Sequence, residues 1–342
     1  MWWGTRSKLN TKCPVSLNLF PSWWNRNYGI TYGMRIFENP EYRAQTFKEM
    51  NRLAWERFGD VGFGEEEADL VWTLDDLNNA TMPALLGCEV VYPDDNYAIA
   101  RPVSEEQIMS LNAPEDISTI WPISEIIRQT EYINNRYNQN LKPAWAYMGV
   151  QNIASITRGV ELYSDYYLQP SLARHLLDIS TEMIIDSVEY FRSTGSEISV
   201  ICNQNCTVPL CGPKVYEEFL LGYEKQLHQY AKSIDAQYYI HHCGILDPYL
   251  QIYNRIDDVY AFDIGWGSDL RLALDAFPKS SFNLIIGHTF IMQATATEAR
   301  DMALQIIDTA GPDINRLSVV FSDLEHQTPD ENIKAFTQAF IN

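Results

Sequence analysis

The segment YYIHHCGILDPYL, residues 238–250, ends an apolar and aromatic run with two histidines and a cysteine. The whole chain has six His and six Cys, so a notable share of both stands together here. Side chains two positions apart on a strand point to the same side, and His241 and Cys243 would therefore face one point while His242 turns away. A neutral imidazole and a thiolate are ligands that zinc prefers. The pattern predicts a metal site at the end of a strand, although a buried cysteine also serves in many proteins as a small apolar residue.

Four further apolar runs also end in residues that can bind a ligand. In chain order these residues are Asn203, Asn205 and Cys206, then Asp263, then His288, then Ser322 and Asp323 with Glu325 and His326 close behind. In a barrel of parallel strands such ends meet at one face, where the active site lies. The catalytic candidates are His241, Asp263 and His288, and the substrate-binding candidates are Asn203, Asn205 and Trp266, together with Trp23 and Trp24 from the N-terminal segment.

The elements that would hold these residues alternate between short apolar runs and amphipathic segments from about residue 140 onward. At least six runs predict strands, from 143–149 to 317–321, and helices are predicted between them, for example at 170–195 and 212–234. The runs are continuously apolar, which is typical of buried parallel strands with helical crossovers. Because no GxGxxG motif follows the first strand, we predict an α/β fold of the (β/α)8 or TIM barrel type rather than a doubly wound sheet.

We expect a single domain over residues 1–342, in which 1–60 form an irregular N-terminal extension that covers the barrel. One helix is predicted inside this extension, at 39–60. The paired tryptophans Trp23 and Trp24 would either cover an aromatic substrate or pack on the end of the barrel.

The composition excludes several kinds of partner. The chain carries 25 Lys and Arg against 45 Asp and Glu, a net charge of −20, whereas nucleic acids and anionic membranes are bound by clustered cations. No apolar run reaches the ~18 residues of a membrane-spanning helix, and the N-terminus lacks the features of a signal peptide. The sequence therefore predicts a cytoplasmic protein with reduced cysteines and with neither nucleic acid nor membrane as partner.

Several segments, in their order and spacing, resemble the uroporphyrinogen decarboxylase superfamily. They are YIHHCGILDPYLQIYNRIDDVYAFDIG, NLIIGHT, TATEARDMALQII and FSDLEHQTPDENIKAF, preceded by PALLGCEVVYPDDN. The chain is most similar to the cobalamin-linked methyltransferase branch, over roughly residues 40–340. The resemblance implies a (β/α)8 barrel, in agreement with the pattern of the elements.

The decarboxylase branch fits the sequence less well. Its members carry an arginine-rich N-terminal segment of MRQAGR type that holds the porphyrin carboxylates. The corresponding region here, WWNRNYGITYGMRI, has Arg26 and Arg35 but not that motif, and an acidic chain suits a polyanionic porphyrin poorly.

The methyltransferase branch holds zinc with a His-x-Cys pair and a distal Cys. His241 and Cys243 match the pair, but Ser322 stands where the distal Cys would be. The resemblance then implies that a nearby oxygen or nitrogen completes the site, and the expected ligand set is His241, Cys243, Asp323 and His326. Cys206, reaching across from the neighbouring strand end, is the alternative third ligand.

The loss of one thiolate would leave zinc a harder Lewis acid, which suits an oxygen leaving group. The resemblance therefore implies a zinc-dependent methyltransferase that moves a methyl group between a small donor, such as a methoxylated aromatic (O-demethylation), and cobalamin. No Asp-x-His-x-x-Gly corrinoid-binding motif is present, so the cobalamin would be carried by a separate corrinoid protein. A homodimer, common among such barrels, is included among the expected partners.

Two alternatives stay open. The first is a metal-free decarboxylase of the uroporphyrinogen decarboxylase type, acting on a tetrapyrrole or another polycarboxylate. The second is a barrel that has lost catalysis and serves as a binding subunit, an interpretation that rests only on Ser322.

Overall fold

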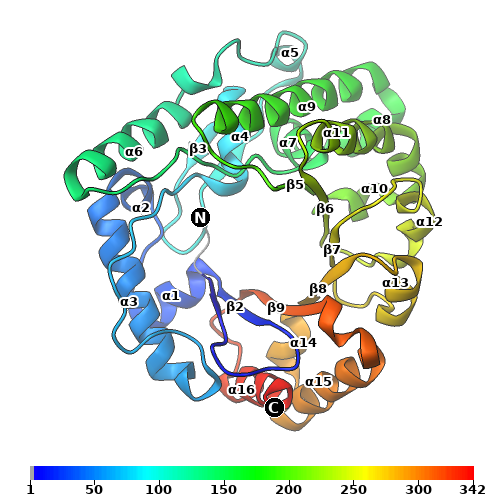
Figure 1. Ribbon diagram of the computed structural model, residues 1–342. Helices are drawn as coiled ribbons and strands as arrows, with labels where there is room; N and C mark the ends of the chain where they lie inside the picture. The colour runs from blue at the N-terminus through cyan, green and yellow to red at the C-terminus, as the bar shows by residue number, and fades with distance from the viewer. Residues whose placement is uncertain (1–3) are drawn as a thin grey trace.

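A computed structural model describes residues 4–342 and shows a mixed α/β protein built on one curled sheet (Figure 1). The seven strands lie in the order β1 (Gly4–Arg6), β2 (Val15–Leu19), β9 (Leu317–Leu324), β8 (Ser281–Ile286), β7 (Ala261–Ile264), β6 (Gln237–His242) and β5 (Val200–Gln204). All neighbours from β2 to β5 pair in parallel, and β1 pairs antiparallel with β2. The prediction of parallel strands with helical crossovers is confirmed.

The expected closed eight-stranded barrel is not confirmed, because the strands of residues 4–342 form an open sheet with β1 and β5 at its edges. The predicted strand at 143–149 has no ladder, although it runs beside β5. A side-chain carbonyl, that of Asn203, accepts the N–H of Val150 at 3.1 Å, and the Tyr147 hydroxyl accepts the N–H of Cys202 at 3.2 Å. Side chains thus take the hydrogen bonds that a further strand would have made with β5.

The helices after residue 150 form the outer layer around the sheet, as predicted for crossovers (Figure 1). They are α7 (Val150–Arg158), α8 (Leu162–Leu168), α9 (Pro170–Ser193), α10 (Val208–Val215), α11 (Leu221–Ser233), α12 (Leu250–Tyr253), α13 (Leu270–Ala276), α14 (His288–Gln293), α15 (Ala296–Ala310) and α16 (Asp330–Phe340). Local signals explain where several begin. Proline occupies the first turn of α9, and Thr295 with Glu298 forms a capping box at the start of α15.

The first 140 residues contribute more to the sheet than expected, because β2 lies within the predicted irregular extension. Its sequence, VSLNL, alternates between apolar and polar residues, unlike the continuously apolar runs of the later strands. The other elements of this part are α1 (Pro21–Tyr28), α2 (Met34–Glu38), α3 (Pro40–Phe58), α4 (Thr81–Leu85), β3 (Glu89–Val91), β4 (Ile99–Arg101), α5 (Glu105–Ile108) and α6 (Ile123–Tyr137). The helix α3 confirms the prediction at 39–60.

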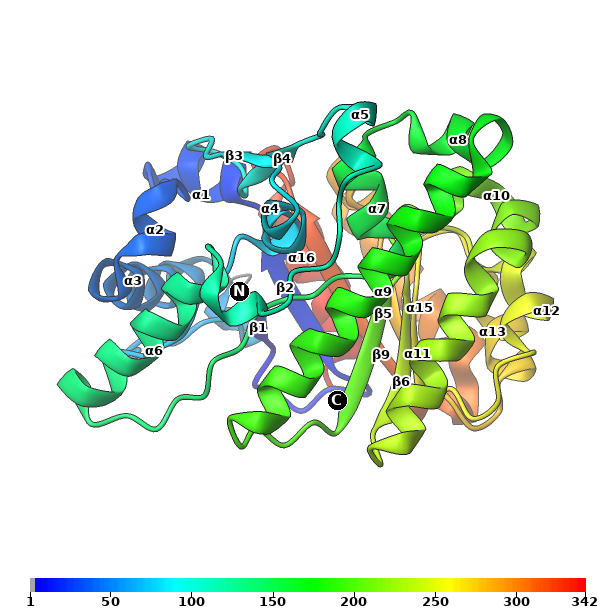
Figure 2. The same cartoon turned by 90° about the horizontal axis from the view of Figure 1, so that it is seen from above.

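Figure 2 shows α1, the β3–β4 hairpin, α5, α8 and α10 along one end of the molecule, the end towards which β2 and β9 run. The carboxyl ends of parallel strands therefore meet under these elements. Within residues 4–342, no helix has both the length and the apolar character needed to cross a lipid bilayer.

Candidate metal centre and cavity

Three metal-ligating side chains converge at the carboxyl ends of β5 and β6. Cys206, His241 and Cys243 bring one ligand atom each to within 4.8 Å of one another. The two strands pair in parallel with Gln204 opposite His241, so the residues that follow β5 arrive beside those that end β6. The N–H of Asn205 also donates to the carbonyl of His241 at 2.6 Å, and this hydrogen bond fixes the loop that carries Cys206. Of the two ligand sets considered from the sequence, the structure assembles the one that contains Cys206.

Asp323 and His326, expected as further ligands, lie outside this cluster, which is the one group of at least three His, Cys, Asp or Glu donors found among residues 4–342. Asp323 lines the same cavity as His241 and Cys243, whereas His326 does not line it. The His326 ring faces Glu325 instead, with Nδ1 4.0 Å from a carboxylate oxygen. Asp323 and His326 lie apart because β9 ends at Leu324. Asp323 belongs to the strand, whereas His326 belongs to the following turn.

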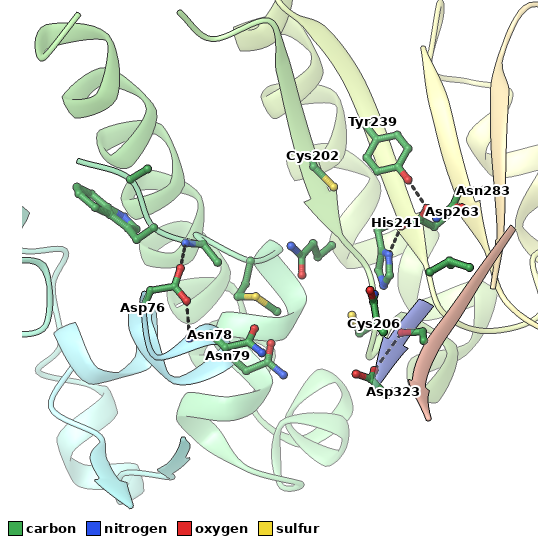
Figure 3. Close-up of a pocket in the computed structure, with 18 of the residues that line it drawn as sticks. Asp76, Asn78, Asn79, Cys202, Cys206, Tyr239, His241, Asp263, Asn283 and Asp323 are labelled. Atoms are coloured by element: carbon green, nitrogen blue, oxygen red, sulfur yellow. Dashed lines mark hydrogen bonds and ion pairs between the residues drawn. The ribbon is translucent and has the colours of Figure 1, made fainter. Parts of the chain in front are cut away.

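A carboxylate orients the imidazole of the cluster (Figure 3). His241 donates from Nδ1 to one oxygen of Asp263 in a short hydrogen bond, and its Nε2 lies 2.6 Å from the Cys243 sulfur. The second oxygen of Asp263 accepts from the Tyr239 hydroxyl and from the Asn283 amide, the latter at 2.7 Å. With Nδ1 occupied, Nε2 is the nitrogen left to bind a metal, the arrangement that metal-binding histidines commonly have.

The electrostatics of the cluster follow from its contacts. Burial opposes a charge on His241, but its hydrogen bonds to Asp263 and Cys206 outweigh burial and raise the pKa of the imidazole to about 10. The hydrogen bond from Cys243 lowers the pKa of the Cys206 thiol well below its usual range, and the same contact raises the pKa of Cys243. The contact between the two sulfurs thus favours the thiolate form of Cys206 and the thiol form of Cys243. Two sulfurs and one imidazole nitrogen are a donor set that zinc uses, so these residues fit that ion.

The cluster forms one end of a cavity of about 860 Å³. The opposite wall is largely apolar and comes from two segments outside the sheet, with Trp72, Leu74, Trp145 and Met148 among its residues. Asp76 links these two segments, because its carboxylate accepts from the N–H of Ala146 and from that of Asn78 (Figure 3). The segment at 143–149 is therefore a wall of the cavity rather than a strand.

Asn203 and Asn205, expected to bind substrate, do not face the cavity. Both are buried and neither lines the cavity. Their amides donate to the buried carboxylate of Glu224, at 3.0 and 2.8 Å, and this carboxylate also accepts from Tyr216 and Tyr238. The two amides thus anchor the loop of Cys206 to α11 instead of facing a substrate.

His242 turns away from the cluster, as the strand periodicity predicts. Its Nδ1 lies 3.0 Å from the Tyr253 hydroxyl, and burial lowers the pKa of its ring to about 4, so the ring is neutral at neutral pH.

The remaining candidates do not line the cavity. Trp23 and Trp24 are fully buried and pack against each other with ring centroids 4.9 Å apart, which matches the packing alternative. Trp266 stacks on Phe290 at 4.9 Å, and His288 is exposed at the start of α14. Sequence reasoning missed several cavity residues, namely Tyr239, Asn283, Trp72 and Trp145. Tyr239 precedes His241 by two positions on one strand, and this spacing is a signal that places both on one face.

Comparisons with protein families, curated proteins and solved structures place the chain in one family. Residues 69–341 match the model of the uroporphyrinogen decarboxylase (URO-D) family. The methylcobamide:CoM methyltransferase MtbA of Methanosarcina mazei is 21% identical over 151 residues, which are 44% of this chain and 44% of that protein. MtbA of Methanosarcina acetivorans is 18% identical over 187 residues, 54% of each chain. The chain thus spans about half the length of the curated relatives it matches.

Among solved structures, a methyltransferase from Methanosarcina mazei has a similar fold, with a TM-score of 0.63 at 15% identity over 98% of this chain and 93% of that chain. The family match covers most of the described residues, including β5 to β9 and every member of the cluster. The chain therefore belongs to the uroporphyrinogen decarboxylase (URO-D) family, and within it the chain resembles the methylcobamide methyltransferases.

Proposed function

We propose that this protein is a zinc-dependent methyltransferase that moves a methyl group between a small molecule and the cobalamin of a separate corrinoid protein. The observation that carries the proposal is the cluster of Cys206, His241 and Cys243 at one end of a large cavity. The methyltransferase names of the matched relatives support the reaction class, and the name of MtbA includes a methylcobamide.

Each residue of the cluster has a defined task in this proposal. Cys206, His241 and Cys243 would hold the zinc, and Asp263 would keep the imidazole turned with Nε2 towards it. Three protein ligands are the number found in catalytic zinc sites, which leave one position for substrate. When bound, zinc supplies a Lewis acid that polarises the heteroatom carrying the methyl group.

A methoxylated aromatic is the methyl donor that the cavity favours. A volume of about 860 Å³ is large for a very small donor and lies in the range, ~300–1,000 Å³, that encloses a ring-sized ligand. Two indoles, Trp72 and Trp145, together with Leu74 and Met148 supply a wall for such a ring. The reaction would break the bond between the oxygen and the methyl carbon and leave a phenol.

A thiol as the methyl acceptor is the second candidate, and Cys206 favours it. The expectation of a harder zinc ion with one thiolate ligand rested on Ser322, which stands in place of the distal cysteine. With Cys206 in the cluster the set has two sulfurs again, and a thiolate-rich zinc suits a soft sulfur substrate.

The two alternatives from the sequence have less support. A polycarboxylate substrate needs several cations, but among the described residues that line the cavity Lys142 is the one Lys or Arg. A binding subunit without catalysis was suggested by the missing distal cysteine, and Cys206 offers a replacement for that ligand.

Methyl transfer with purified protein and free cobalamin tests the proposal. Zinc-loaded wild type is incubated with cob(I)alamin and methoxybenzene derivatives, and separately with methylcobalamin and 2-mercaptoethanol, while the cobalamin absorbance is followed. We expect transfer in one of the two reactions, and its loss in Cys206→Ala and His241→Ala. The control Cys88→Ala changes a buried cysteine outside the cavity and should keep the activity. Equal rates in wild type and both cluster variants would contradict the proposal.

A further inference from the structure

We infer that Asp323 is the proton donor to the heteroatom that loses its methyl group, a role distinct from the metal ligation expected for it. This inference rests on the proposed function. Asp323 lies at the carboxyl end of β9 and lines the cavity at the same end as Cys206 and His241 (Figure 3). It lines the cavity without belonging to the group of donors that lie within 4.8 Å of one another.

One carboxylate oxygen of Asp323 accepts a hydrogen bond, and the other has no hydrogen-bond partner in the described structure. The hydroxyl of Ser322 donates to Oδ2 at 3.1 Å, while Oδ1 is buried and has no hydrogen-bond partner in the described structure. A buried polar atom without a partner costs ~1–3 kcal/mol, and such atoms in native structures call for an explanation. The protonated carboxyl group lowers this cost because it carries no negative charge, so the unpartnered oxygen favours the acid form.

The backbone at Asp323 is also unusual. Its φ of 55° lies in the left-handed region, which a residue with a Cβ adopts at a cost. The flanking residues hold this conformation, because Phe321 and Leu324 are fully buried and the carbonyl of Leu324 accepts from the N–H of Phe20 at 3.0 Å. Backbone strain of this kind clusters at functional sites, and here it turns one acidic side chain of β9 into the cavity.

The surroundings of the carboxyl group favour its protonated form. Burial is the largest effect and raises the pKa of Asp323 to about 6, partly offset by the hydrogen bond from Ser322. The titratable groups that face it from other elements are Cys206 on the β5–α10 loop, His241 and Cys243 at the end of β6, His288 at the start of α14, and Tyr97 on the β3–β4 hairpin.

The proton balance of O-demethylation requires such a group. Cob(I)alamin supplies the electron pair of the new cobalt–carbon bond and is oxidised to methylcob(III)alamin. The methyl–oxygen bond breaks, its electron pair stays on the oxygen, and the proton of the Asp323 carboxyl group moves to that oxygen to give a phenol. Asp323 is left as a carboxylate and regains a proton from water. Without the proton an alkoxide or phenoxide must depart as an anion, which general acid catalysis avoids.

The test compares leaving groups in Asp323→Asn and wild type, with zinc loaded and free cob(I)alamin as acceptor. The donors are 4-methoxytoluene, whose phenol is a weak acid, and 4-methoxybenzonitrile, whose phenol is a stronger acid and leaves more easily without a proton. We expect Asp323→Asn to slow the first donor by about 10²–10⁴-fold and the second far less. The variant should also keep its zinc, since Asp323 is not a ligand.

The pH profile supplies a readout that a structural role would not move. The wild-type rate should fall as the pH rises through the pKa of Asp323, and this limb should be absent in Asp323→Asn. In the control Ser322→Ala the carboxylate loses a hydrogen bond that stabilises it, so the limb should move to higher pH.

Three results would overturn the inference. Loss of zinc in Asp323→Asn would make Asp323 a ligand, and an equal slowing of both donors with an unchanged pH profile would leave it no role in proton transfer. Wild type that transfers methyl from neither donor but from methylcobalamin to 2-mercaptoethanol would overturn the inference and keep the proposed function. Wild type that is inactive in both reactions would show that the proposed function itself has failed.

Discussion

At the scale of single residues, the cluster depends on a carboxylate that touches no metal ligand except His241. Asp263 receives the imidazole N–H on one oxygen and two further donors, Tyr239 and Asn283, on the other. The second pair of contacts fixes the carboxylate, and Ser318 extends the chain by donating to the Asn283 carbonyl at 2.9 Å. A ring held in this way loses little conformational freedom when it binds a metal.

We therefore predict that Asp263→Asn weakens zinc binding by about 10–100-fold, because a neutral amide holds the imidazole N–H less strongly. Competition with a chromogenic chelator measures the affinity. Asp269→Asn is the matched control, since Asp269 is exposed and caps α13 outside the cavity, a task that asparagine also performs. An affinity in Asp263→Asn equal to that of wild type would remove the orienting role.

Part of the cluster could be predicted from residue types alone. His241 and Cys243 stand two apart at the end of an apolar run, and Asp263 ends the next one, so strand periodicity is enough to bring them together. Cys206 stayed an alternative because its place depends on which strand pairs with β6. His326 was expected from its distance in sequence to Ser322, but β9 ends before it and the turn carries it away.

At the scale of elements, the segment at 143–149 must lie close against β5. A Cβ at Gly149 would stand 2.1 Å from the carbonyl oxygen of Gln204, so only glycine allows this approach. The contact places Trp145 and Met148 in the wall of the cavity. The position of this wall therefore depends on one residue without a side chain.

We predict that Gly149→Ala destabilises the protein by about 1–3 kcal/mol, because neither backbone can move away freely. Gly222→Ala is the matched control, since Gly222 lies inside α11 and a Cβ there meets no atom within 4 Å. That change should be neutral or stabilise by about 0.5–1 kcal/mol. Urea denaturation compares the two, and equal stability of both variants would show that the contact with Gln204 is not tight.

The loop that carries Cys206 depends on Glu224 of α11. This carboxylate is buried and accepts four hydrogen bonds, two of them from Asn203 and Asn205. Removing it leaves several buried donors without an acceptor, which costs ~1–3 kcal/mol each.

We predict that Glu224→Ala lowers the free energy of unfolding by about 3 kcal/mol or more and also weakens zinc binding, because the loop loses its anchor. Glu217→Ala is the control, since Glu217 is half exposed and its ion pair with Arg255 contributes only ~0–1 kcal/mol. Denaturant unfolding and chelator competition measure the two effects. Unchanged zinc affinity in Glu224→Ala would show that the position of the Cys206 loop does not depend on the hydrogen bonds to Glu224.

Most elements of the second half could be predicted because short, continuously apolar runs alternate there with amphipathic helical segments. The helix expected at 170–195 is α9, Pro170–Ser193, and the run at 317–321 lies in β9. The segment 143–149 is apolar for a different reason, since its side chains form a cavity wall. A short apolar run does not distinguish these two cases, and β2 was missed because it is short and alternates.

At the scale of the whole molecule, the cavity lies inside a curled sheet that does not close. The strand patterns predicted parallel neighbours but held no information on closure, which depends on how segments 70–79 and 141–149 pack across the gap. The apolar core does not involve the cluster, so the fold should persist without metal.

We predict that zinc raises the melting temperature of the wild type and leaves that of His241→Ala unchanged. A ligand that binds only the native state stabilises it by about 2.7 kcal/mol at 100 times its dissociation constant. Far-ultraviolet circular dichroism of the chelated wild type should remain that of a folded protein. Unfolding on chelation would instead mean that the metal is structural.

X-ray absorption at the zinc edge of the loaded wild type tests most directly whether Cys206, His241 and Cys243 hold the metal. The account predicts two sulfur neighbours at about 2.3 Å and one imidazole nitrogen at about 2.0–2.1 Å, with one sulfur lost in Cys206→Ala. A single sulfur in the wild type, with oxygen in place of the second, would contradict the account and return Asp323 to the ligand set.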